Sequence, residues 1–186
     1  MREQQSTRCA IFGQHPICFD WGFDEEDEGC RNMKQELLQQ IMALRQCGVT
    51  QFYVACDFGV GLYAAEQINV LRETDPDLML YCVTPHEEHA TKWAPYLRER
   101  YFDMLVKCTH ISSASPYEQP KAQLLAYKKI IDQADIVLTV YGIPATRAGR
   151  AEDQAMLYAI GSNKPIIKID PYTLTVKLLR DNYIEI

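Results

Sequence analysis

The chain has 186 residues, of which 47% are hydrophobic and 24% charged, and its net charge is −6 at pH 7. This length fits one domain with a sizeable core, and the composition is ordinary for a soluble globular protein. No apolar run reaches the roughly 18 residues that a membrane span needs, and the N-terminal residues lack the long apolar stretch of a secretory signal. We therefore expect a cytoplasmic protein that does not associate with membranes.

The cysteines and the charged residues exclude further classes. The seven cysteines form no CxxC pair, and several lie in apolar runs, which favours a reducing compartment and no disulfide framework. The negative net charge argues against nucleic acid as a partner, because phosphate-backbone contacts need a basic patch. The densest charge run, residues 24–28, is acidic and predicts a solvated loop or a helix N-terminus. It lacks the ligand spacing of a metal site, so we expect no metal.

The first half of the chain predicts alternating strands and helices. Residues 8–13 form an apolar strand candidate, and apolar residues at helical spacing then continue until Gly48, which is typical of a helix end. A second strand at residues 51–56 leads through a glycine-containing turn into a helix that stops before Pro76. A third strand follows at residues 78–83.

The second half continues the alternation. Residues 87–107 are mostly helical in pattern, with Pro95 as a kink or break, and residues 106–111 are a fourth strand candidate. The remaining expected elements are a helix at 119–133, a strand rich in β-branched residues at 134–141, a helix at 151–161, a strand at 165–169 and an ambiguous tail from 173 to 186.

This alternation predicts the fold class. Parallel strands joined by right-handed helical crossovers give a single-domain, doubly wound α/β fold with a mostly parallel, Rossmann-like sheet. Loops that follow the strands then collect at one edge of the sheet, where such folds bind ligands. Five loops should form the site: residues 13–16, 57–61, 84–86, 109–115 and 142–152.

Four motifs in order along the chain carry a family resemblance. They are the Gly13-Gln14-His15-Pro16 turn after the first strand, the FGVGLYAAE segment at 58–66, Thr84-Pro85 with Trp93 beyond, and Thr109-His110 before a Ser-Pro-Tyr-rich loop, a helix and the ADIVLTVY strand. In this pattern the chain resembles the YpsA-like branch of the SLOG superfamily, which includes the SMF/DprA and lonely-guy proteins. The resemblance covers nearly the whole chain and implies one SLOG-type domain over residues 1–186.

The resemblance also implies a function. It suggests a bacterial-type protein that binds a nucleotide-derived small molecule, such as a nucleoside phosphate or an ADP-ribose-like compound, as a sensor or regulator that self-associates into a homodimer. It implies no other cofactor. One alternative is lonely-guy-like cleavage of a nucleoside monophosphate at its N-glycosidic bond. A second alternative is DprA-like binding of single-stranded DNA, against which the acidic charge balance argues.

Two departures from the family pattern concern the chemistry. Lonely-guy proteins carry a P-G-G-x-G-T-x-x-E motif, whereas residues 141–154 offer Gly149, Arg150 and Glu152 without the double glycine or the Gly-Thr step. Relatives also show Ser-Gly at the second strand end and an acidic residue two places after the second glycine of the turn. Here Cys56-Asp57 replaces Ser-Gly and Gly61 stands where the acid is expected. Asp57 could substitute for that acid from the other side of the turn.

The candidate site residues follow from the loops and the resemblance. Gly59 and Gly61 bring backbone amides to a phosphate, or they only permit a tight turn. Asp57 and Glu152 hold a ribose or act as catalytic carboxylates, or they only favour helix N-termini. Arg147 and Arg150 supply charge for a phosphate, or lie in a solvated loop. The full set of expected ligand-binding residues is Gly13, His15, Pro16, Asp57, Gly59, Val60, Gly61, Thr84, His110, Gly142, Arg147, Gly149 and Arg150.

Overall fold

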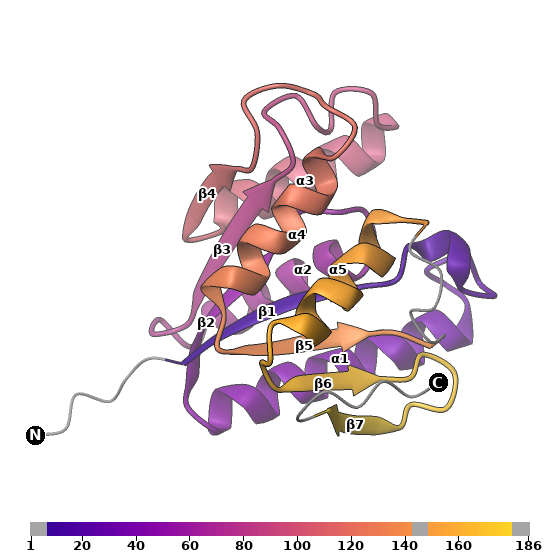
Figure 1. The fold of residues 1–186 in the computed structure, drawn as a ribbon, viewed down its shortest axis with the longest axis vertical. Coiled ribbons are helices and arrows are strands. Elements are labelled where there is room, and N and C mark those ends of the chain that lie inside the picture. The colour runs from indigo at the N-terminus through magenta and orange to yellow at the C-terminus, as the bar shows by residue number, and fades with distance from the viewer. Residues whose placement is uncertain (1–6, 143–148, 180–186) are drawn as a thin grey trace, which may run out of the picture.

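A seven-stranded sheet organises the molecule (Figure 1), and the computed structural model describes residues 7–142 and 149–179. Its strand order is β4-β3-β2-β1-β5-β6-β7. The strands are β1 (Thr7–Gly13), β2 (Val49–Val54), β3 (Met79–Thr84), β4 (His110–Ser113), β5 (Ile136–Val140), β6 (Ile166–Ile169) and β7 (Val176–Leu179). The helices are a 3-10 turn η1 (Pro16–Cys18), α1 (Glu28–Gln46), α2 (Val60–Arg72), α3 (Pro95–Lys107), α4 (Ala122–Gln133) and α5 (Ala151–Gly161).

Every strand pair in the sheet is parallel except β6 and β7, which are antiparallel. The predicted α/β class with a mostly parallel, Rossmann-like sheet is thus confirmed. The tail that was ambiguous in sequence supplies the antiparallel edge strand β7. Its burial is slight, which explains why no strong apolar pattern marked it.

Two hydrophobic layers cover the two faces of the sheet. One layer joins the sheet to α1, α2 and α3, and the other joins it to α4 and α5. Alternate residues of β1 divide between them, because successive side chains of a strand point to opposite faces: Ile11 belongs to the first layer and Phe12 to the second. Both faces of the central strands are therefore buried, as the continuous apolar runs indicated.

Local sequence signals explain where α1 begins and ends. The Asp27 side chain accepts a hydrogen bond from the backbone N–H of Gly29 at 2.7 Å, which caps the first turn. Apolar residues one turn apart, such as Leu37 and Ile41, are fully buried. Gly48 follows the helix with φ +99°, a conformation that favours glycine, and leads directly into β2.

Two expected elements differ from the structure. The helix expected from residue 87 begins only at Pro95, because proline fits the first turn of a helix and cannot continue one that precedes it. The strand expected at residues 106–111 is wrong in its bounds, because α3 runs to Lys107 and β4 covers only His110–Ser113. These shifts move His110 to the start of its strand.

The acidic run at residues 24–28 is the helix N-terminus that the sequence predicted, but it is not wholly solvated. The Glu25 side chain is only 20% exposed and forms ion pairs with Lys34 and Arg100. Arg100 also pairs with Glu66 on α2. The run therefore ties the loop before α1 to α2 and α3 through a cluster of opposite charges.

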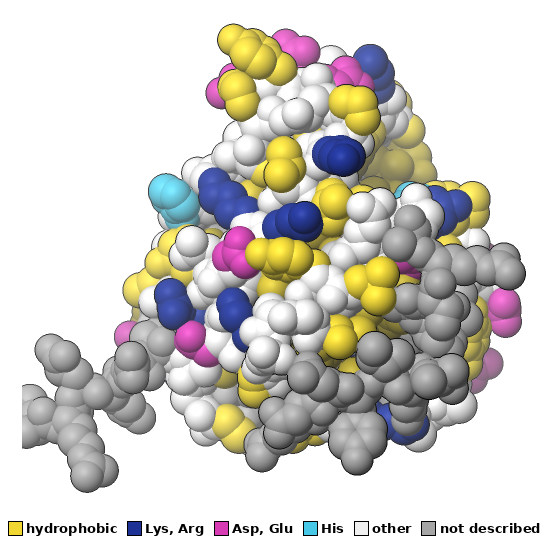
Figure 2. Space-filling model, in the orientation of Figure 1, with side chains coloured by type: hydrophobic (Ala, Val, Ile, Leu, Met, Phe, Trp, Pro, Cys, Tyr) yellow, Lys and Arg dark blue, Asp and Glu magenta, His cyan; other side chains and the backbone are white. Residues whose placement is uncertain are grey.

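The surface over α4 and α5 carries Lys and Arg side chains interspersed with apolar and acidic ones (Figure 2). On this face the basic side chains do not form one continuous patch. Within the described residues, no helix has the length and apolar character needed to cross a bilayer.

Candidate functional site

The candidate site lies at the carboxyl ends of β1, β2 and β5. In the strand order, β1 stands between β2 and β5, so the chain winds away from β1 in two opposite directions. This is the switch point at which doubly wound sheets bind ligands. A hydrogen bond joins the segments that follow β1 and β5 at this edge: the Gln14 side-chain oxygen accepts from the backbone N–H of Gly142 at 2.7 Å.

The turn between β2 and α2 presents the start of a helix at this edge. Gly59 is the N-cap residue of α2 and has φ +142°, which side chains on L-residues rarely allow. Gly59 has no side chain to cap the helix, and the Asp57 carboxylate accepts from the N–H of Gly61 in the first turn instead. A Cβ atom on Gly59 would lie 2.9 Å from the Pro16 ring. The turn is therefore packed directly against the loop that follows β1.

Two further glycines allow this close packing. A Cβ on Gly13 would lie 2.5 Å from Cγ2 of Val60, so Gly13 lets β1 approach the start of α2. A Cβ on Gly61 would lie 2.9 Å from Oδ1 of Asp57, so Gly61 leaves room for that carboxylate. The Asp57 carboxylate thus fills the space beside the position at which the family resemblance predicts an acid.

A buried tyrosine bridges two buried carboxylates at the site. The Tyr127 hydroxyl, on α4, lies 2.8 Å from Oδ2 of Asp57 and 3.3 Å from Oε1 of Glu152. All three residues are buried, with Asp57 8% and Glu152 7% exposed. Oδ1 of Asp57 accepts from the backbone N–H of Gly61 at 3.0 Å. The hydroxyl has a single proton, so it can donate to only one carboxylate at a time.

This environment changes the acidity of Asp57. Burial raises the pKa of Asp57 to about 6, and the charge of Glu152 acts in the same direction. The hydrogen bonds from Tyr127 and Gly61 oppose the rise. Asp57 therefore exchanges its proton close to neutral pH, which is common at binding and catalytic sites.

The loop after β1 adds a histidine. The Nδ1 atom of His15 accepts a hydrogen bond from the backbone N–H of Ile17 at 3.3 Å, so this ring caps η1. Burial lowers the pKa of His15, the charge of Glu152 opposes that effect, and the charge of Arg150 adds to it. His15, Arg150 and Glu152 are therefore close enough for their charges to interact.

The structure brings together most of the residues that the sequence predicted. Those that gather around the ends of β1, β2 and β5 are Gly13, His15, Pro16, Asp57, Gly59, Val60, Gly61, Gly142, Arg150 and Glu152. Gly149 is exposed and directly precedes Arg150, and Arg147 lies outside the described residues.

Two predicted residues lie apart from this group. The Thr84 hydroxyl shares a hydrogen bond with the Ser113 hydroxyl at 2.8 Å, so it joins the ends of β3 and β4. His110 is exposed and begins β4, so it stands toward the opposite end of the sheet from the carboxyl edge. His110 is therefore not placed to act with Asp57.

Tyr127 belongs to the site but was not identified from the sequence, whereas Gln14 lies in a predicted site loop and was given no role of its own. Tyr127 occupies a core position of its helix, where it reads as an apolar residue. One signal was available, because a buried tyrosine hydroxyl needs a hydrogen-bond partner. The partner carboxylates lie 70 and 25 residues away in sequence, which no local pattern reveals.

The sheet order, with its switch point at β1, defines a Rossmann-like α/β protein. A family model named YpsA and described as "YspA SLOG family" matches residues 9–174, so the chain belongs to this family. The membership points to a nucleotide-related protein.

Relatives from several bacteria are similar over most of the chain. The UPF0398 protein BH1768 of Halalkalibacterium halodurans is 31% identical over 121 residues, which is 64% of this chain and 64% of that protein. The UPF0398 protein YpsA of Bacillus subtilis is 29% identical over 151 residues, which is 77% of this chain and 83% of that protein. A UPF0398 protein of Bacillus thuringiensis is 30% identical over 135 residues, which is 71% of this chain and 72% of that protein.

Proposed function

We propose that the chain binds a nucleotide-derived small molecule, such as a nucleoside phosphate or an ADP-ribose-like compound, at the carboxyl edge of β1, β2 and β5. The observation that carries this proposal is the pair of buried carboxylates, Asp57 and Glu152, that share one tyrosine proton beside the start of α2. Buried carboxylates without enough donors are costly, and a ligand with hydroxyl groups would supply donors.

The phosphate would bind at the start of α2. Backbone N–H groups of the first helical turn have no partner within the helix, and the helix dipole favours an anion there. The N–H of Gly61 is already used by Asp57, which leaves neighbouring first-turn amides for the ligand. The guanidinium of Arg150, at the start of α5, would add a second contact, since its charge already acts on His15 in the loop after β1.

The ribose would bind between the two carboxylates. A ribose carries neighbouring hydroxyl groups, and each can donate one hydrogen bond to a carboxylate oxygen. Tyr127 satisfies one carboxylate at a time, so the other remains an acceptor for the sugar. The same geometry makes the site selective for sugars over simple phosphates, because only a sugar completes the hydrogen bonding of both acids.

A thermal-shift experiment tests this proposal. The wild-type protein is titrated with AMP, ADP-ribose and inorganic phosphate, and a bound ligand raises the melting temperature with its concentration. We expect a saturable rise with a nucleotide, a smaller one with phosphate, and loss of the nucleotide effect in Glu152→Gln. Glu99→Gln, an exposed change of the same kind on α3, is the matched control. No shift with any nucleotide, or an unchanged shift in Glu152→Gln, contradicts the proposal.

The acidity of Asp57 favours one enzymatic alternative, N-glycosidic cleavage of a nucleoside monophosphate. A pKa of about 6 lets Asp57 donate a proton to the departing base near neutral pH. Water would attack the anomeric carbon as its bond to the base breaks and would pass its proton to the ionised Asp57, and the Glu152 carboxylate would stabilise the positive charge that develops at that carbon.

Chromatography of AMP incubated with the protein tests this alternative. It predicts free adenine and ribose 5-phosphate in equal amounts, and no release by the Asp57→Asn, Glu152→Gln double variant. Turnover that survives both substitutions would exclude these carboxylates as the catalytic groups. Binding of AMP without any release of adenine would leave only the binding function.

A further inference from the structure

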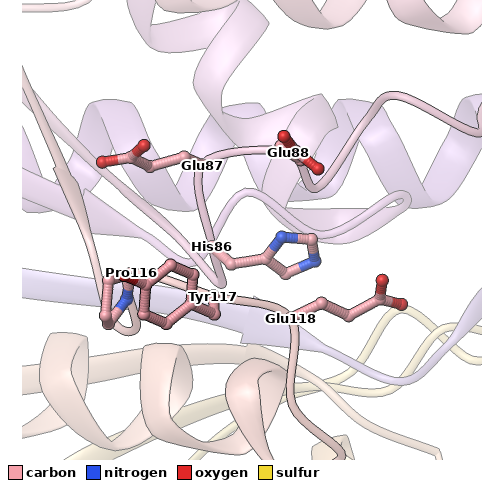
Figure 3. Close-up of a pocket in the computed structure, with 6 residues that line it drawn as sticks. All are labelled: His86, Glu87, Glu88, Pro116, Tyr117 and Glu118. Carbon is pink, nitrogen blue, oxygen red and sulfur yellow. The ribbon is translucent and has the colours of Figure 1, made fainter.

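A hollow of about 170 Å³ lies apart from the candidate site, between the loops that follow β3 and β4. Its lining residues are His86, Glu87, Glu88, Pro116, Tyr117 and Glu118 (Figure 3). The volume corresponds to about six water molecules, which is enough for one small functional group on a short stem. None of its lining residues belongs to the proposed nucleotide site.

The two loops that form the hollow are held in place by hydrogen bonds. The backbone N–H of Ser115 donates to the carbonyl of Pro85 at 3.0 Å and joins the loops. The Ser115 hydroxyl donates to the carbonyl of Tyr117 at 2.8 Å, and Gln119 donates to that hydroxyl at 2.8 Å. The hollow is therefore formed before any ligand arrives, which reduces the cost of binding.

The charge of the hollow is negative. Glu87, Glu88 and Glu118 line it, and Figure 3 draws the carboxylates of Glu88 and Glu118 on the side of the His86 ring and that of Glu87 turned the other way. Lys92 forms an ion pair with Glu118, with its Nζ atom 3.5 Å from a carboxylate oxygen. The two side chains of that pair are 84% and 70% exposed, so water screens the pair and Lys92 neutralises little of the charge.

A buried histidine points into the hollow without a hydrogen-bond partner. His86 is nine-tenths buried, and within the described part of the chain its imidazole forms no hydrogen bond. Figure 3 shows the ring directed to the side where Glu88 and Glu118 lie. Its packing contact is an edge-to-face arrangement with His89, with ring centroids 5.6 Å apart. The His86 nitrogens are not among the fully buried atoms that lack a partner in the described residues, so they open to the hollow, where a ligand can bond to them.

The arrangement fits an organic cation better than a metal ion. Among the described residues, no three His, Cys, Asp or Glu side chains converge as metal ligands do. Tyr117 is 78% exposed, and Figure 3 draws its ring beside Pro116, turned away from the carboxylates of Glu88 and Glu118. Separated carboxylates suit a flat or extended group that carries several N–H donors.

We propose that this hollow binds the guanidinium or ammonium group of an organic cation. The carboxylates of Glu88 and Glu118 accept from its N–H groups, and an imidazole nitrogen of His86 accepts another hydrogen bond. The cation can be a free amine such as agmatine or an arginine side chain of another protein. Both agmatine and an arginine side chain carry a guanidinium group, and the experiment distinguishes a free amine from a protein side chain as the ligand.

NMR titration of the full chain with agmatine tests this site. We expect saturable shifts of the backbone amides of residues 86–88 and 115–118, and none with N-butylurea, which has a similar shape but no charge. The Glu88→Gln, Glu118→Gln double variant should bind agmatine about tenfold more weakly, because charged hydrogen bonds are lost. Glu28→Gln, Glu73→Gln, a pair of exposed residues elsewhere, changes the net charge equally and should bind as the wild type does.

A blocked tripeptide with a central arginine forms the second arm. Tighter binding of the peptide than of agmatine identifies a protein side chain as the ligand, and tighter binding of agmatine identifies a free amine. The proposal is overturned if neither cation gives saturable shifts at these residues. It is also overturned if N-butylurea binds as well as agmatine, or if the double variant keeps the wild-type affinity.

Discussion

Replacing Asp57 with asparagine should stabilise the protein at neutral pH. The pKa of Asp57 rises from 3.8 to about 6 on folding, so the folded state holds its proton more tightly than the unfolded state does. The free energy of unfolding therefore falls as the pH rises from about 4 to about 6, by about 3 kcal/mol, since each pKa unit is worth about 1.4 kcal/mol. Asparagine does not ionise, so the free energy of unfolding of the variant does not fall in this way as the pH rises.

The gain is smaller than the full amount, because the new amide group cannot accept every hydrogen bond that the carboxylate accepts. Tyr127 and Gly61 both donate to Asp57, and one of these bonds is weakened at a cost of about 1 kcal/mol. We therefore expect Asp57→Asn to be more stable than the wild type by about 1 to 2 kcal/mol at pH near 7.5. Near pH 4 it should be no more stable than the wild type.

Urea unfolding at both pH values, followed by circular dichroism under reducing conditions, measures this difference. Asp135→Asn is a control of opposite sign. Arg8 lowers the pKa of Asp135, so the ionised carboxylate stabilises the fold at neutral pH and this contribution is lost in acid. Asp135→Asn should therefore be less stable than the wild type at neutral pH. A variant at Asp57 that is less stable than the wild type at both pH values would refute the reasoning. Asp57 would then act only as a favourable cap for α2.

Two further substitutions test the packing around the site. Gly61→Ala places a Cβ 2.9 Å from the Asp57 carboxylate and should lower stability by about 1 to 3 kcal/mol in thermal unfolding. Gly161→Ala is the control, because a Cβ there meets no atom within 4 Å, and it should cause no loss of stability. Arg100→Gln breaks the pairs with two partly buried glutamates and should cost about 2 kcal/mol in urea unfolding, with little relief from salt. Lys107→Gln, which breaks an exposed pair, should change stability far less, and equal losses would contradict the importance of burial.

The fold could be predicted from the sequence because its signals are local. Apolar strands that alternate with helical patterns fix a parallel sheet, and the glycine turn after β2 marks its functional edge. The prediction failed where the signal depends on context. Pro95 is compatible with either a kink or a helix start, and only the turns before it decide between them. The edge strand β7 gains its order from β6 rather than from its own pattern.

The chemistry of the site depended on contacts between distant parts of the chain. Asp57 and Glu152 were identified as candidate carboxylates because each follows a strand in the expected order. The bridge that Tyr127 makes between them was not predictable, because it joins three elements that are distant in sequence. His110 was expected at the edge, and the later start of β4 moved it away.

The position of a bound nucleotide tests the central claim most directly. In an NMR titration with AMP or ADP-ribose, we predict saturable shifts of the backbone amides of residues 59–62 at the start of α2 and of residues 13 and 14 after β1. These shifts should saturate together, because one ligand contacts both segments. Shifts confined to other parts of the protein, or no saturation at either segment, would contradict the assignment of this crevice as the nucleotide site.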